Sequence, residues 1–351
     1  MKLKIFFSFF FFLFFIFLFA EENLILSPEQ ILSSLQNIDD NSKINYLEEL
    51  YKFELNENNL LQLLNSIDFK NNQITFLIKK IFIKNSKNIE KLCEIIFFEK
   101  FNNDLIRERN IISFIELLKG INLNKSQTEN IKTLLKLFIE LEKNSYLKEL
   151  CLNYLKDKFS DDDIDYLIDI YNEEKNENLK LLLIDILNKI NNIKTLNFLI
   201  GLSYNTNNKI KEKVITLLAN KNDKILILPL LNSLDDTDEL IIQNAIYGLR
   251  KYKTNLAFEK ILNFLNHPNL IIQQESIYCI GNFENDTALI KLLELYISNN
   301  NQEIRKTIEN VIKQNNYFSL QKIEKLKSSL FETNSIILEN LIKNIYQYKK
   351  L

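Results

Sequence analysis

The chain has 351 residues but only four Gly, three Pro and one His, and it has no Trp. Glycine-rich phosphate loops and all-β turns need glycines that this chain lacks, and one His cannot form a multi-histidine metal site. The 46 acidic and 44 basic residues nearly cancel, so no basic field favours nucleic acid.

Residues 1–20 have the layout of a secretory signal peptide. Two lysines form a basic start, residues 5–19 are apolar apart from one Ser, and Ala20 precedes an acidic pair. The apolar run is shorter than the roughly 20 residues that span a membrane as a helix. We therefore expect an exported protein that is cleaved after Ala20. Because Leu18 is large for the third position before a cleavage site, an uncleaved membrane anchor is the alternative.

The composition also bears on the compartment. Lys, Asn, Ile and Phe are used heavily, whereas Ala and Gly are rare, a bias that is typical of an AT-rich genome. This bias favours a bacterial protein of the periplasm or cell envelope over a protein secreted by a eukaryote. No Cys stands near Ala20, so we do not expect a bacterial lipoprotein.

Residues 21–160 show helix pairs through their apolar pattern. Apolar residues recur at i, i+4 and i+8, which places them on one stripe of an α-helix. First helices are expected near residues 60–67, 89–98 and 131–141, and a further pair between 31 and 55. The second helices of the three pairs carry these series: Ile74, Ile78 and Phe82; Ile106, Asn110 and Phe114; Leu147, Cys151 and Leu155.

An acidic run at residues 160–165 has the alternating aspartates of a calcium-binding loop. The loop needs Gly at position six and Glu at position twelve, but these positions hold Tyr166 and Asn172. We interpret the run as a helix start, with Ser160 or Asp161 as the N-cap residue and the other carboxylates beside the positive end of the helix dipole.

From residue 161 the apolar pattern repeats with a step of 31 residues, each unit consisting of helix, polar turn, helix. One residue is inserted before the last copy of the repeat. The series are Leu179, Ile210, Ile241, Ile272 and Ile304; Leu183, Val214, Ala245, Ser276 and Ile308; Leu187, Leu218, Leu249, Ile280 and Ile312.

This unit resembles a HEAT repeat. The resemblance is carried by the turn 266–269, by the pair Ile304–Arg305, and by small residues of the second helices: Ala245, Gly248, Ser276 and Gly281. It implies an all-α fold, an α-solenoid of about ten stacked antiparallel helix pairs that form a HEAT-like superhelix. Armadillo and other α-solenoids are neighbouring alternatives.

We divide the chain accordingly. After the signal peptide come divergent helical repeats at 21–160, central HEAT-like repeats at 161–316, and a C-terminal capping helix pair at 317–351. A first helix is expected at 320–330, followed by a second with apolar residues at 337, 341 and 345.

No residue indicates catalysis, cofactor binding or metal binding. His267 lies in an inter-helix turn that the repeat requires, and no nucleophile and carboxylate can be placed beside it. The lysines near the second helices alternate with glutamates, which indicates a solvated mixed-charge face and no nucleic-acid partner. The three cysteines sit in helical apolar patterns and are interpreted as small buried residues: Cys93, Cys151 and Cys279.

The HEAT resemblance implies a protein that holds another polypeptide. We expect a non-enzymatic scaffold or adaptor that binds an unidentified protein partner along its curved surface. The second helices near 208–218, 240–250 and 271–281 would line the binding side. The contact candidates are Gln243, Asn244, Gln273 and Gln274.

Several alternatives stay open. Tyr247 and Tyr278 occupy one repeat position and belong either to the core or to an exposed binding platform. The protein is alternatively a structural envelope protein held in the membrane by an uncleaved N-terminal helix, or a subunit of an envelope-modifying enzyme. A membrane contact is expected only if the N-terminal segment is uncleaved.

Overall fold

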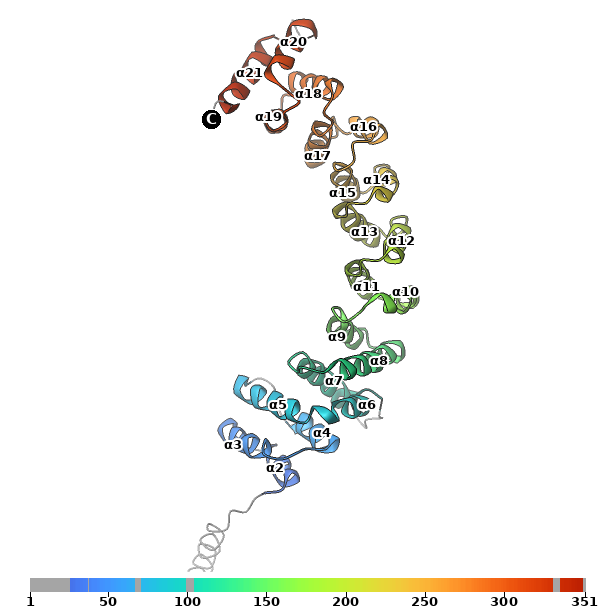
Figure 1. Ribbon diagram of the computed structural model, residues 1–351, viewed down its shortest axis with the longest axis vertical. Coiled ribbons are helices and arrows are strands. Elements are labelled where there is room, and N and C mark those ends of the chain that lie inside the picture. Colours follow the sequence, from blue (N-terminus) through green and yellow to red (C-terminus); the bar gives the residue numbers. More distant parts are fainter. Residues whose placement is uncertain (1–25, 37, 67–70, 99–103, 331–334, 350–351) are drawn as a thin grey trace, which may run out of the picture. The chain divides into compact units, whose positions relative to one another are not determined.

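The computed structural model describes residues 26–36, 38–66, 71–98, 104–330 and 335–349 (Figure 1). The signal peptide predicted for residues 1–20 lies outside this part of the chain. In the described residues all regular elements are helices, and twenty α-helices, α2 to α21, form ten consecutive pairs. The all-α prediction is therefore confirmed. The chain divides into two compact units, Met1–Phe159 and Ser160–Leu351.

The first unit contains four helix pairs. Its core is rich in aromatic side chains: the ring of Phe97 lies 4.6 Å from that of Phe138 and 6.1 Å from that of Phe114, both edge to face. The pairs are α2 (Pro28–Ser34) with α3 (Asp40–Leu50), α4 (Glu57–Ser66) with α5 (Asn72–Lys84), α6 (Ile89–Phe98) with α7 (Asp104–Leu118), and α8 (Lys125–Leu141) with α9 (Ser145–Leu155).

The second unit contains six pairs, and the residues predicted from the 31-residue step are buried in it. Ile210, Ile241 and Ile272 are at most 4% exposed. The pairs are α10 (Ile164–Glu173) with α11 (Glu177–Lys189), α12 (Ile193–Leu202) with α13 (Asn208–Asn220), α14 (Ile227–Ser233) with α15 (Glu239–Leu249), α16 (Asn255–Leu262) with α17 (Leu270–Gly281), α18 (Asp286–Ser298) with α19 (Gln302–Gln314), and α20 (Leu320–Leu330) with α21 (Ser335–Lys349).

Consecutive second helices of this unit pack closely, α13 on α15, α15 on α17, and α17 on α19. Two glycines permit the approach. A Cβ atom on Gly248 would lie 2.9 Å from the Ala219 Cα of α13, and one on Gly281 would lie 2.1 Å from a Val311 methyl group of α19. Both distances are shorter than van der Waals contact, so these positions require glycine for steric reasons.

Asparagine begins many of these helices. In the described part of the chain ten Asn side chains accept a hydrogen bond from the first turn of the helix that they precede. Four of them also donate Nδ2 to an acidic residue near the start of the preceding second helix, at 2.6–3.1 Å. These four pairs are Asn71–Asp40, Asn144–Glu108, Asn207–Glu177 and Asn269–Glu239, and they hold neighbouring layers in register.

One predicted stripe differs from the structure. Ile106 of α7 is 47% exposed, whereas Asn110 is fully buried and its amide has no hydrogen-bond partner among the described residues. The buried face of α7 continues through Ile111, Phe114 and Ile115. Asn110 and Phe114, the other two residues of the predicted series, are both buried, so only Ile106, in the first turn of α7, departs from it.

Candidate protein-binding surface

The predicted contact residues lie on α15 and α17, and most of them hold the layers together. Asn244 donates Nδ2 to Thr216 Oγ1 of α13 at 2.9 Å, and Gln274 donates Nε2 to Thr307 Oγ1 of α19 at 3.4 Å. Gln273 is only 8% exposed and donates to the Leu265 carbonyl oxygen at 2.6 Å. Gln243 is half-buried. Gln273 therefore does not fit the predicted role as a contact residue, because its amide completes the packing between the helices of its own pair.

An exposed aromatic group lies on the same two helices. Tyr247 of α15 is 41% exposed, and Tyr278 of α17 is half-buried. The guanidinium carbon of Arg250 lies 4.6 Å from the ring centroid of Tyr278 and 5.6 Å from that of Tyr247. Together with Glu275 these residues form what we call the Tyr–Arg cluster. The tyrosines were expected to belong either to the core or to an exposed binding platform, and the exposure of Tyr247 favours the binding platform.

The polar groups of the Tyr–Arg cluster are incompletely satisfied. Arg250 Nη2 lies 3.4 Å from Glu275 Oε2, yet Arg250 Nε and Glu275 Oε2 are buried and have no hydrogen-bond partner in the described part of the chain. Burial raises the pKa of the Glu275 carboxyl group, and the Arg250 charge opposes that rise only in part. Buried charges with unused hydrogen-bonding capacity cost folding free energy, and such sites are concentrated where proteins bind or react.

A small polar pocket adjoins Tyr278, with a volume of about 290 Å³. Lys253 and Glu284 line it and form an ion pair at 3.1 Å. Asn282 donates to the Arg250 carbonyl oxygen at 3.2 Å, and Asn315 donates to the Gly281 carbonyl oxygen at 2.6 Å. The pocket thus has walls fixed by contacts between successive layers, next to an exposed ring. The remaining lining residues are Gly281, Val311, Gln314 and Asn316.

Sequence reasoning missed Arg250 and Glu275. The available signal was the recurrence of Tyr247 and Tyr278 at the 31-residue step, with one of only four arginines following Tyr247 by three residues. Residues three apart lie on one helix face, which brings Arg250 beside Tyr247. The ion pair with Glu275 depends on the contact between α15 and α17, which no local pattern reveals.

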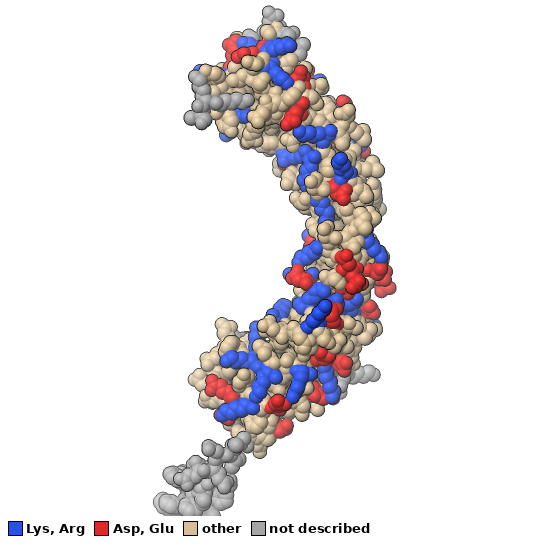
Figure 2. All heavy atoms as spheres, in the orientation of Figure 1, with Lys and Arg blue, Asp and Glu red and all other residues tan. Residues whose placement is uncertain are grey.

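The charged surface is mixed, as expected. Figure 2 shows Lys and Arg interspersed with Asp and Glu on the face drawn. Ion pairs link neighbouring second helices at 2.7 Å, as between Lys213 and Asp185. Ion pairs with acidic residues thus neutralise Lys209, Lys211 and Lys213 of α13.

The remaining candidates have structural roles. Ser160 is the N-cap residue at the acidic run, where its amide donates to the Asp163 carboxylate at 3.0 Å, so the helix-start interpretation is confirmed. Among the described residues no group of three or more His, Cys, Asp or Glu is arranged to hold a metal ion. His267 lies in the turn between α16 and α17 and accepts the Asn269 amide at Nδ1, at 3.1 Å.

The cysteines are unpaired and buried, as predicted. Burial raises the pKa of Cys93 and Cys151 far above the usual range and that of Cys279 to about 12. A thiol that stays protonated is a poor nucleophile, so these residues act as packing groups. No helix in the described ranges has the length and apolar character that a bilayer span needs.

Comparison with solved structures identifies the architecture. The chain matches free Kap121p with a TM-score of 0.52 at 14% identity, and Kap121p bound to Nup53p with a TM-score of 0.51 at 12% identity. The fold is a HEAT-repeat α-solenoid. The HEAT resemblance of the central units is thus confirmed at the level of fold. Each match covers 92% of this chain and 41% of Kap121p, so this HEAT-repeat solenoid spans about two fifths of the length of that protein.

The E. coli protein YibA also matches, over 80% of this chain and 100% of its own, with a TM-score of 0.46 at 15% identity. No family model matches the sequence, and no curated protein resembles it in sequence.

Proposed function

We propose that this protein is an exported scaffold that binds another polypeptide through the second helices of residues 160–351. The observation that carries the proposal is the Tyr–Arg cluster, which places an exposed tyrosine, a stacked arginine and a fixed polar pocket on adjacent helices. Tyr and Arg dominate the residues on which protein–protein binding energy concentrates, since they bury a large area and lose little conformational entropy.

The fold supports a protein partner as well. A stack of helix pairs exposes a long row of second helices, which suits contact with an extended partner. Kap121p, whose fold is similar, is seen in complex with Nup53p.

Export to the periplasm or cell envelope is part of the proposal and is supported by residues 1–20. The alternative is a structural envelope protein that keeps residues 5–20 as a membrane anchor. N-terminal sequencing of the protein recovered from the cell envelope separates the two, because a start at Glu21 shows cleavage and rejects the anchor.

We also propose that the scaffold is not an enzyme. The Tyr–Arg cluster pairs its carboxylate with an arginine and includes no nucleophile, which suits recognition better than catalysis. A subunit of an envelope-modifying enzyme is the less favoured alternative. That alternative would be supported if an enzymatic activity co-purified with the protein and the Tyr247→Ala variant lost this activity while it still bound the partner.

The binding surface is tested by affinity capture from envelope extract. Full-length protein, the Tyr247→Ala variant and the Tyr278→Ala variant are compared for recovery of the same partner band. Loss of a central aromatic anchor should weaken binding by about tenfold or more.

The matched control is Tyr146→Ala, since Tyr146 is 55% exposed at the start of a second helix in the first unit. Equal recovery by all variants would reject the Tyr–Arg cluster as the binding surface. A loss shared by Tyr146→Ala would show that exposed tyrosines act non-specifically.

A further inference from the structure

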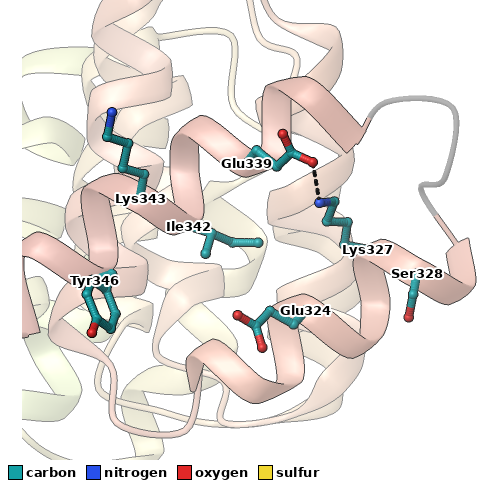
Figure 3. A pocket seen from close by; sticks show the side chains of 7 residues that line it. All are labelled: Glu324, Lys327, Ser328, Glu339, Ile342, Lys343 and Tyr346. Atoms are coloured by element: carbon teal, nitrogen blue, oxygen red, sulfur yellow. Dashed lines mark hydrogen bonds and ion pairs between the residues drawn. The ribbon is translucent and has the colours of Figure 1, made fainter.

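A groove of about 660 Å³ lies between α20 and α21, the last described helix pair (Figure 3). Lys327 of α20 and Glu339 of α21 close it at one side through an ion pair at 2.7 Å. Ile342 lies in the middle, and Tyr346 follows it one turn later on α21 (Figure 3). The groove therefore has an apolar centre with a charged margin. Its other lining residues are Glu324, Ser328 and Lys343.

The repeat register shows which side of α21 this groove belongs to. Leu341 and Ile345 continue the core series of Ile308 and Ile312 in α19, so that Ile342 and Tyr346 correspond to Glu309 and Lys313. The two α19 residues face the next layer. Glu309 accepts Asn344 Nδ2 of α21 at 3.0 Å, and Lys313 Nζ lies 5.8 Å from the ring centroid of Tyr348.

The same position faces the next layer one repeat earlier. Gly281 of α17 corresponds to Lys313 of α19 and touches Val311, a residue of the following second helix. By this register Ile342 and Tyr346 lie on the side of α21 that a further second helix would pack against. The described neighbours of α21 are α19 and α20, and Tyr346 is 49% exposed. The groove is thus a stacking surface for a helix.

The charges on this surface are arranged for self-recognition. Glu324 and Lys343 lie on opposite sides of Ile342 (Figure 3), and neither has an ion-pair partner among the described residues. A surface with an acid on one side and a base on the other, around an apolar centre, matches a copy of itself that is turned by a twofold rotation. Each acid then meets the base of the other copy.

We propose that this groove docks a second copy of the same chain, with the two α21 helices packed across a twofold axis. Ile342 and Tyr346 form the apolar centre, and Glu324 of each copy pairs with Lys343 of the other. A contact between one helix pair from each copy falls at the small end of interface sizes, so we expect reversible, concentration-dependent dimers. This proposal does not depend on the Tyr–Arg cluster.

The test is sedimentation velocity of the full chain, kept in solution with a nonionic detergent, over a wide range of protein concentrations. The wild-type chain should dimerise. Glu324→Lys and Lys343→Glu should each weaken dimerisation by about tenfold or more, because each places like charges opposite one another. An equimolar mixture of the two variants should dimerise again, since every acid in the mixed dimer faces a base.

The matched controls are Glu259→Lys and Lys306→Glu, the same charge changes at exposed positions outside the groove. Circular dichroism shows whether every variant keeps the helical content of the wild-type chain. The proposal is overturned if the wild-type chain stays monomeric at all concentrations or if the single variants dimerise as the wild type does. It is overturned equally if the mixture of folded variants fails to recover the dimer.

Discussion

The two units build the same helix pairs with different side chains between the layers. In the second unit the second helices have 11 to 15 residues, repeat at a nearly constant step, and approach through glycine and alanine. In the first unit the second helices have the same 11 to 15 residues, but the step between them varies, since they begin at residues 40, 72, 104 and 145, and large aromatic rings fill the spaces. Its core also contains Asn110, an amide without a hydrogen-bond partner among the described residues.

This difference shows what a constant repeat step provides. When each layer is a copy of the last, a small residue meets the same neighbour every time, and close backbone contact can be kept through many layers. When the step varies, neighbouring layers are not copies of one another, and bulky side chains fill the spaces between them to reach native packing density. The second unit should therefore be sensitive to added volume, and the first unit to changes in polarity.

The largest effect is expected at the closest contact of the second unit. Gly281→Ala places a methyl group 2.1 Å from a Val311 methyl group, a clash that is relieved only if Val311 leaves its rotamer or α17 and α19 move apart. We expect a loss of about 3 kcal/mol in the free energy of unfolding, measured by urea denaturation followed by circular dichroism. Adding Val311→Ala removes the clashing methyl group and should recover part of the loss.

Gly201 of α12 provides the control. A Cβ atom there would meet nothing within 4 Å. Gly201→Ala should raise stability by up to about 1 kcal/mol, because alanine loses less backbone entropy in a helix. If Gly281→Ala and Gly201→Ala changed the free energy of unfolding in the same direction, the close approach of helices would not distinguish the two positions.

The next effect concerns polarity in the first unit. Asn110 and Asn85 are both at most 1% exposed, but Asn85 accepts the Leu55 amide at 2.7 Å and donates to the Ile81 carbonyl oxygen at 2.8 Å. Asn110→Leu should stabilise by about 1–2 kcal/mol, because it removes a buried amide without partners. Asn85→Leu should destabilise by a similar amount, because it leaves the Leu55 amide buried and unpaired. Thermal and urea unfolding of both variants checks the opposite signs, and destabilisation by Asn110→Leu would contradict the interpretation.

A smaller effect tests the asparagine contacts between layers. Asn269→Asp keeps an N-cap oxygen for α17. It removes the Nδ2 donor that lies 2.6 Å from Glu239 Oε2 and places a second carboxylate beside Glu239. We expect a loss of about 1 kcal/mol at neutral pH. Asn301→Asp changes an N-cap residue whose Nδ2 makes no contact with an acid in the described structure, and it should be nearly neutral. Equal losses would show that the layer contact adds nothing to capping.

The smallest effect is a pH dependence shared by the two units. Burial alone would raise the pKa of Glu142 and of Asp236, but hydrogen bonds and the charges of Arg107 and Lys211 lower both. A lowered pKa in the folded state contributes stability above the unfolded pKa, and that stability is lost as pH falls through the folded pKa. Glu142→Gln and Asp236→Asn should each cost less than about 1 kcal/mol at neutral pH.

Urea denaturation at several pH values checks this expectation. The stability difference between wild type and each variant should shrink below about pH 4, where unfolded carboxylates also bind protons. A difference that stays constant down to acid pH would show that the ion pairs do not cause it.

Much of the fold could be predicted from local sequence. The first helix expected at residues 320–330 spans Leu320–Leu330, and the ten predicted pairs are present in the described residues. Prediction failed at Ile106, which lies in the first turn of α7 and is 47% exposed, because burial at the end of a helix is set by the packing of neighbouring helices and not by the apolar pattern. The candidate site was predicted only in part, since Asn244 and Gln274 turned out to be tied to adjacent layers.

The scarcity of glycine and the 31-residue period by themselves determined an all-helical repeat protein, because helical periodicity is a property of neighbouring residues in the chain. The composition did not explain the many asparagines, which cap helices and also join neighbouring layers through their side-chain amides. Only the tertiary structure decided that Gly281 must be glycine and that Arg250 stacks on Tyr278. Both depend on the distance between second helices, which is fixed where side chains from separate repeats meet.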